Sequence, residues 1–327
     1  MSLRRSVRRG SAALVSGALL AFTSGALAHA DTVAFVLRDN RISRAAGLAV
    51  NTDRGVYWTV QAGAGDGIVY AIKPDGSTEG RVLFDANLVD AQAVSLRGEK
   101  VFVGDIGDAK AQRDHVSVYR LDDSEPRTRG ANFTQWDFVY PNGPRGAAAM
   151  LVSPTGRIFI VTKESPQGHI YASPSPLGDG KNRLIEVGRA PAGVTDATFL
   201  IDGRMALRTS ASVVVLDPAT YVVTSQAALG GAMAGEALTT SLDRGGLLVG
   251  TLGVDSKVYK VPLPSAPPPS ATTTAPSTPA SGQPSASATP DPTQPTSTPA
   301  NNGVVWALLG AGALALAAGL VVYFRRS

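Results

Sequence analysis

A repeated unit of short β-strands is the feature of this sequence that most restricts its fold. The clearest copy, Ala147–Pro174, reads as an apolar strand, a Pro-Thr-Gly turn, a second strand, a Ser-Pro-Gln-Gly turn and a third strand. Short apolar runs separated by turn residues are typical of an antiparallel meander. Because the unit recurs along the chain, the sequence predicts an all-β repeat protein.

Five alanines mark five copies of the unit, each at an equivalent place in the first strand. These anchors are Ala49, Ala93, Ala149, Ala197 and Ala237. They lie about 44, 56, 48 and 40 residues apart, which is typical of four-stranded propeller blades. A small residue suits this position because the innermost strands of a propeller crowd around a central axis. We therefore predict a β-propeller of five blades.

The remaining strands of each copy follow its anchor. Second strands are expected at Val56–Val60, Val101–Val103, Ile158–Thr162, Met205–Arg208 and Leu247–Gly250. The third strand carries an aliphatic-Tyr pair in four copies, and fourth strands are expected at Arg81–Phe84, Thr134–Tyr140, Leu184–Val187 and Tyr221–Thr224. The last copy lacks a fourth strand, and we expect Thr32–Leu37 to supply it and close the ring, since an open edge invites aggregation.

Two other folds fit the repeat. Six blades are the first alternative, because the long second step contains the additional apolar run Asn132–Tyr140. An ordinary β-sandwich with chance internal similarity is the second alternative.

The N-terminal segment has the pattern of a secretory signal. Four arginines precede the apolar run Ala12–Leu27, and Ala28-His29-Ala30 fits the small-x-small cleavage rule. We predict that residues 1–30 are a signal peptide and that residues 31–264 form the propeller domain. The chain contains no cysteine, so the core must stabilise an exported domain without disulfides.

The C-terminal segments indicate a membrane anchor. Residues 265–302 are rich in Pro, Ser and Thr and are expected to form a disordered linker. Residues 303–324 carry no charge over a length that can span a bilayer, and Arg325-Arg326 follow. We therefore predict a single-pass type I protein of the cell membrane with a transmembrane helix at 303–324, a cytoplasmic tail at 325–327 and the propeller outside the cell.

The positive net charge of +4 belongs to the targeting segments. Without the six arginines near the two termini, 24 basic residues face 26 acidic ones. Nucleic-acid binding therefore has no support from the composition.

Few residues offer catalytic chemistry. Only His115 and His169 follow the signal segment, and we expect His169 to be an exposed residue at a strand end. Two histidines without cysteine do not make a classical zinc site, and no Gly-x-Ser-x-Gly elbow is present. The glycine-rich segment Gly63–Gly67 joins two expected strands, so it predicts a hairpin loop and no phosphate-binding site.

Carboxylates are the better candidates. Asp105, Asp108 and Asp114 form an acidic turn after a second strand, where they could bind Ca²⁺ or only satisfy the turn. A second group lies beside the anchors, at the expected channel mouth, where it could bind a cation or a polar ligand or only hydrogen-bond water. Its members are Asp196, Glu236, Asp90 and Gln92.

Three segments resemble a known family. AAGLAVNTDRGVYWTVQ, VFVGDIGDAKAQRDHVSVYRL and GRIFIVTKES are similar to uncharacterised secreted or membrane-anchored β-propellers (WD40/YVTN-like) of high-GC Gram-positive bacteria. Relatives tend to carry acidic residues on most innermost strands. This chain has Asp196 and Glu236 there, but Ala91-Gln92 and Gly146-Ala147-Ala148 in two other copies. The resemblance implies the fold, and a metal or catalytic centre in relatives would be weakened here.

The sequence favours a binding module for an extracellular protein or an envelope glycan, because loops from all blades converge at one face of a propeller. The alternative is a hydrolase or lyase that uses a channel Ca²⁺ held by Asp196 and Glu236, together with Asp105 or Asp108. An inert spacer on a stalk is a third possibility.

Overall fold

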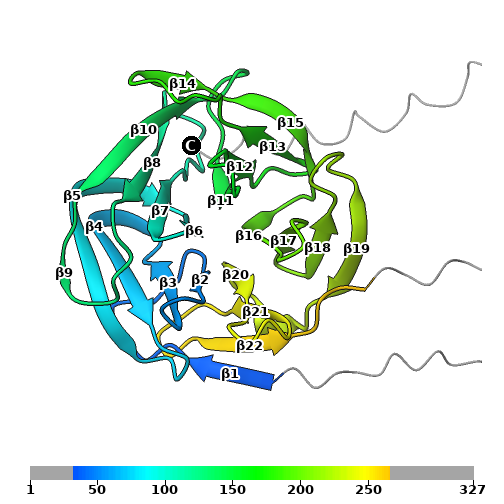
Figure 1. The fold of residues 1–327 in the computed structure, drawn as a ribbon. Helices are drawn as coiled ribbons and strands as arrows, with labels where there is room; N and C mark the ends of the chain where they lie inside the picture. Colours follow the sequence, from blue (N-terminus) through cyan, green and yellow to red (C-terminus); the bar gives the residue numbers. More distant parts are fainter. Residues whose placement is uncertain (1–31, 266–327) are drawn as a thin grey trace, which may run out of the picture. The chain divides into compact units, whose positions relative to one another are not determined.

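The computed structural model describes residues 32–265, which form an all-β propeller of five blades around a central axis (Figure 1). The predicted signal peptide, linker, transmembrane helix and tail lie outside the described residues. Within residues 32–265 no helix is long and apolar enough to cross a membrane.

Each blade is one antiparallel sheet that runs outward from the axis. Blade 1 contains β2 (Ala49–Asn51), β3 (Val56–Val60), β4 (Gly63–Ile72) and β5 (Thr78–Ala91). Blade 2 contains β6 (Ala93–Arg97), β7 (Lys100–Asp105), β8 (Val116–Leu121) and β10 (Phe133–Val139). Blade 3 contains β11 (Ala147–Val152), β12 (Ile158–Thr162), β13 (Gly168–Ala172) and β15 (Ile185–Ala190).

Blade 4 contains β16 (Val194–Phe199), β17 (Met205–Thr209), β18 (Ser212–Leu216) and β19 (Val223–Ala228). Blade 5 contains β20 (Ala237–Thr240), β21 (Leu247–Gly250), β22 (Lys257–Val261) and β1 (Thr32–Val36), and the short 3-10 helix η1 (Gly231–Met233) precedes it. Every alanine anchor lies in the innermost strand of its blade, as predicted.

The N-terminal strand closes the ring, as predicted. β1 pairs antiparallel with β22, with Thr32 opposite Lys260 and Val36 opposite Lys257. The last blade therefore joins strands from both ends of the folded chain.

The six-blade alternative is wrong. The segment that suggested it forms β10, the fourth strand of blade 2, which pairs with β8. The step between the second and third anchors is long because irregular connections follow β7 and β8 within that blade.

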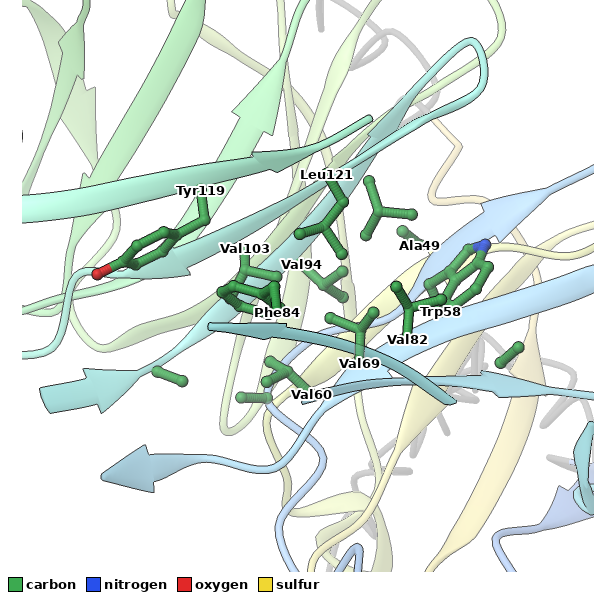
Figure 2. Packing of buried hydrophobic residues seen from close by; sticks show 14 of the residues in the cluster. Ala49, Trp58, Val60, Val69, Val82, Phe84, Val94, Val103, Tyr119 and Leu121 are labelled. Atoms are coloured by element: carbon green, nitrogen blue, oxygen red, sulfur yellow. The ribbon is translucent and has the colours of Figure 1, made fainter. Parts of the chain in front are cut away.

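Apolar side chains fill the space between neighbouring blades, in five separate clusters that together circle the axis. Figure 2 shows the cluster between blades 1 and 2, where Trp58, Val69 and Val82 of blade 1 meet Val94, Val103 and Leu121 of blade 2. Alternate residues of a strand point to opposite faces of its sheet, so each strand can contribute to two clusters. The core is thus continuous around the ring without any disulfide.

Two additional short strands lie outside the predicted pattern. β9 (Arg129–Gly130), from the connection between β8 and β10, pairs parallel with β5 of blade 1. β14 (Lys181–Arg183), from the connection between β13 and β15, pairs parallel with β10 of blade 2. Each outer edge is thus covered by a segment of the following blade.

The outer strands of the other three blades, β15, β19 and β1, are also covered by the following blade, but through individual residue contacts and not through an added strand. Tyr221 of blade 4 lies against Gly188 of β15, and the hydroxyl of Ser225 in β19 donates to the carbonyl of Pro264, 3.0 Å away, which follows β22. The Gly76 carbonyl of blade 1 accepts the N–H of Arg38, just after β1, at 3.1 Å. We call these five contacts the rim clasps.

Candidate functional site

A cavity of about 660 Å³ opens at one end of the channel, where fourth strands connect to the next blade and second strands turn into third strands. We call it the mouth cavity. Its lining residues come from blades 1, 2 and 3 and are largely charged or small. They are Arg44, Asp90, Gln92, Gly107, Asp108, Ala109, Ala111, Pro144, Arg145, Gly146, Ala147, Lys163 and Glu164.

Two cations of the cavity share one carboxylate. The carboxylate belongs to Glu236, which directly precedes β20 of blade 5. Its Oε2 lies 3.2 Å from Arg44 Nη2 of blade 1. Its Oε1 lies 3.3 Å from Lys163 Nζ of blade 3. Blade 4 separates blades 3 and 5, so this arrangement connects blades that are not neighbours. We call Arg44, Glu236 and Lys163 the mouth bridge.

Two of the predicted binding residues, Asp90 and Gln92, line the mouth cavity. Asp90 Oδ1 accepts a hydrogen bond from Gln92 Nε2 at 2.7 Å, and the Asp90 carbonyl accepts the N–H of Gly107 at 3.0 Å. A Cβ atom at Gly107 would lie 2.1 Å from Asp90 Oδ2, so a glycine is required for this carboxylate to sit where it does. Predicted residue Glu236 belongs to the mouth bridge beside them.

The fourth predicted binding residue, Asp196, lies buried among the innermost strands and does not line the mouth cavity. It is fully buried, and its carboxylate accepts the N–H groups of Leu48 at 3.4 Å, Ala197 at 2.8 Å and Leu238 at 2.5 Å, from blades 1, 4 and 5. Burial raises the pKa of Asp196 well above its usual value. Its predicted role in ligand binding gains no support from this position, which suits a residue that holds three blades together.

A buried arginine stands opposite Asp196 in the register of β16 and β17. Arg208 Nη1 donates to the carbonyls of Ala237 and Gly250, each 2.6 Å away, and Nη2 donates to the carbonyl of Met233. Burial lowers the pKa of Arg208 to about 10. The role of Arg208 could not be predicted from the sequence, because an arginine within an apolar strand carries no local sign of burial.

The three predicted metal-binding aspartates are not brought together. Asp105 is buried, and Arg113 Nη1 and Nη2 donate to it at 2.9 and 3.2 Å. Asp108 accepts the N–H groups of Gln112 and Arg113, both at 2.9 Å. Asp114 is exposed, and Lys181 and His115 lower its pKa to about 2.

These contacts do not suit a calcium ion, which needs several oxygen atoms without hydrogen-bond donors directed at them. Across the described part of the chain, no group of three or more His, Cys, Asp or Glu side chains is arranged to hold a metal ion. The Ca²⁺ site therefore stays a prediction that the donor geometry does not support.

The expectation that His169 is exposed is wrong, because only 16% of its side chain is accessible. Its Nδ1 lies 3.0 Å from Glu186 Oε1, and its Nε2 lies 3.6 Å from Glu164 Oε2. Glu164 also pairs with Arg145 and accepts the Thr162 hydroxyl at 2.7 Å. Sequence reasoning missed this group, although Glu164 follows the second strand of its blade much as Asp108 does in blade 2.

Comparisons with known proteins assign no family to the chain and find only distant structural similarity. No protein-family model matches the chain, and no curated protein matches it either. Similar solved structures include a gluconolactonase from Xanthomonas campestris, with 13% identity, a TM-score of 0.44 and coverage of 69% of this chain and 89% of the other. A streptogramin B lyase structure is similar with 13% identity, a TM-score of 0.39 and coverage of 70% and 72%.

A protein of unknown function from Bacteroides caccae is also similar, with 10% identity, a TM-score of 0.40 and coverage of 63% and 69%. Likenesses at this level of identity and TM-score support no conclusion about this chain. The resemblance to secreted propellers of high-GC Gram-positive bacteria therefore stays an expectation from the sequence.

Proposed function

We propose that this propeller is a binding module that holds one unit of an envelope glycan in the mouth cavity. One observation carries the proposal: charged and amide side chains from separate blades converge on a single cavity of about 660 Å³. That volume falls within the range of small-ligand sites, whereas a protein partner would need a broader contact surface.

The cavity offers the hydrogen-bonding groups that a saccharide requires. Arg145, Lys163 and Gln92 carry N–H donors, while Asp90 and Glu164 carry acceptors. Sugar hydroxyls donate and accept, so a wall that mixes both kinds can satisfy several of them at once. The proposed location outside the cell, on a membrane-anchored stalk, rests on the sequence patterns of residues 1–30 and 265–327 alone.

The test blocks the cavity with a large side chain. Ala109 lines the cavity and is exposed, so Ala109→Trp should fill the space without disturbing the core. Ala219→Trp is the matched control, since Ala219 is exposed in the connection between β18 and β19. In a glycan-fragment binding assay on the full-length chain, we expect Ala109→Trp to weaken binding by about tenfold or more and Ala219→Trp to leave it unchanged. Equal binding by both variants would contradict the proposal.

A hydrolase or lyase is the second candidate, and the arrangement around His169 favours it. Glu186 Oε1 lies 3.0 Å from Nδ1 of the imidazole, and Glu164 Oε2 lies 3.6 Å from Nε2. Arg189 Nη1 lies 3.0 Å from Nδ1 and 3.2 Å from Nε2, so the same imidazole also contacts a guanidinium. A histidine oriented by a carboxylate is a common general base. If this candidate is right, His169→Asn abolishes turnover of a bound glycan and leaves its affinity nearly unchanged. A binding module shows no turnover in either form.

A further inference from the structure

We infer that the bound glycan unit is an acidic sugar, whose carboxylate binds Arg44 and Lys163 from the cavity and competes with Glu236 for their N–H donors. This inference rests on the proposed function and adds the chemical class of its ligand.

The mouth bridge has more cationic charge than its single carboxylate balances. In residues 32–265, Glu236 is the sole carboxylate in ion-pair contact with Arg44 or with Lys163. Each cation reaches one oxygen only, at 3.2 and 3.3 Å, although a guanidinium has five N–H donors and an ammonium has three. One further anion can therefore be bound without removing a stronger partner.

The exposure of the three side chains shows from which side an anion can approach. Glu236 is 12% exposed, whereas Arg44 is 48% and Lys163 is 45% exposed. Both cations line the mouth cavity. A carboxylate in the cavity can therefore reach the outer side of both cations, and it competes with Glu236 for their donors.

The other two arginines near the cavity are less accessible, since Arg145 is 19% exposed and Arg113 is 15% exposed. Arg145 pairs with Glu164, and Arg113 makes a two-point contact with Asp105. Two parallel N–H···O bonds between a guanidinium and a carboxylate are stronger and more specific than one. An incoming anion is therefore directed to Arg44 and Lys163.

The other side of the cavity selects against a second acidic group. Within the described chain, no Lys or Arg is in ion-pair contact with Asp90, whose Oδ1 is bonded to Gln92. A carboxylate without a cationic partner accepts hydrogen bonds from hydroxyls and repels anions. The lining also contains no aromatic side chain on which a neutral sugar could stack. These features fit a sugar ring with one acidic group and several hydroxyls, which describes a uronate.

The experiment compares D-glucuronate with D-glucose, because the two share a ring and differ in charge. In calorimetric titrations of the full-length chain, we expect glucuronate to bind at least about tenfold more tightly than glucose, and less tightly as salt is raised. Arg44→Gln and Lys163→Gln should each weaken glucuronate binding by about tenfold. Arg54→Gln, which removes an exposed arginine that is paired with Glu99 away from the cavity, should leave it unchanged.

Glu236→Gln gives the decisive sign. If Glu236 competes with the ligand, the Glu236→Gln variant binds glucuronate about fivefold more tightly than the unchanged protein. If Glu236 instead contacts the sugar directly, the same variant binds glucuronate less tightly. Weaker binding by Glu236→Gln, equal affinity for the two sugars, or no binding of glucuronate overturns the inference. The proposed function fails separately, when Ala109→Trp leaves the binding of glycan fragments intact.

Discussion

The mouth of the channel and the outer rim of the ring are built from different contacts. At the mouth, Glu236 of blade 5 pairs with Arg44 of the neighbouring blade 1 and with Lys163 of blade 3, which is not a neighbour, and both cations are nearly half exposed. At the rim, each outer strand is held by the following blade, mainly through backbone groups and glycines that allow close approach.

This difference separates the residues of the rim clasps, which hold neighbouring blades together, from those of the mouth bridge, which are available to bind a ligand. Ion pairs between exposed groups contribute little to stability, typically about 0–1 kcal/mol. Buried backbone contacts and close packing contribute more to the free energy of unfolding, and adding a single atom at such a contact forces the packed groups apart. We therefore expect the rim clasps to contribute more than the mouth bridge to the stability that the apolar core provides, and the mouth to exchange its partners at low cost.

The largest expected effect tests the rim at Gly76. A Cβ atom there would lie 1.8 Å from the carbonyl oxygen of Val36, and the residue has φ +83°. We expect Gly76→Ala to lower the free energy of unfolding by about 3 kcal/mol or more, measured by urea denaturation. Gly203→Ala is the matched control, since Gly203 has φ +86° and open space around its Cβ position. Its cost should be about 1 kcal/mol, from backbone strain alone, and equal losses would mean that the clasp at β1 contributes nothing.

A smaller effect should follow from Asp39, which comes directly after Arg38 of the same clasp and contacts Thr78 of blade 1. Hydrogen bonds from Arg41 lower the pKa of Asp39 to about 2, and the Thr78 hydroxyl at the start of β5 donates to it at 2.7 Å. Because the pKa is lower in the folded state, the stabilisation is present above the unfolded value near 3.8 and is lost as the pH falls through 2.

We therefore expect Asp39→Asn to cost up to about 2 kcal/mol at pH 6, and this difference from the unchanged protein should shrink toward zero near pH 2. Denaturation curves at pH 6, 4 and 2.5 measure the change. A difference that does not depend on pH would show that the charge of Asp39 has no part in the clasp.

The smallest expected effect is at the mouth. Glu236→Gln should change the free energy of unfolding by less than about 1 kcal/mol, because water can solvate Arg44 and Lys163 once their carboxylate is gone. Thermal and chemical denaturation of the full-length chain measure it. A loss as large as that of Gly76→Ala would remove the distinction between mouth and rim, since the mouth bridge would then be a structural element.

The sequence predicted the ring well because its signals are local and repeated. An alanine in each first strand and an apolar run after it reflect crowding at the axis, and this pattern needs no knowledge of distant contacts. The closing role of Thr32–Leu37 could be inferred because the last copy lacked a strand. β9 and β14 could not be predicted, since strands of two or three residues have no periodicity and their partners lie in another blade.

The site was predicted only in part, for a related physical reason. Asp90, Gln92 and Glu236 stand beside their anchors, so the repeat placed them near the mouth. Arg44 and Lys163 enter the site through contacts between blades 1, 3 and 5, for which no single stretch of sequence gives a sign. The buried position of Asp196 depends on N–H groups of two other blades, so its burial could not be deduced from its own strand.

The pairing of β1 with β22 also sets the order in which the molecule can fold. β1 is the first strand of the domain to be synthesised, and its partner β22 is the last. The pairing of these two strands can therefore form only when nearly all of the domain has been made. Bringing such distant segments together carries an entropic cost before any contact compensates for it, which slows folding. The ring should therefore assemble from blade 1 toward blade 4 and close last, and a chain that ends before Lys257 would leave β1 as an unpaired strand.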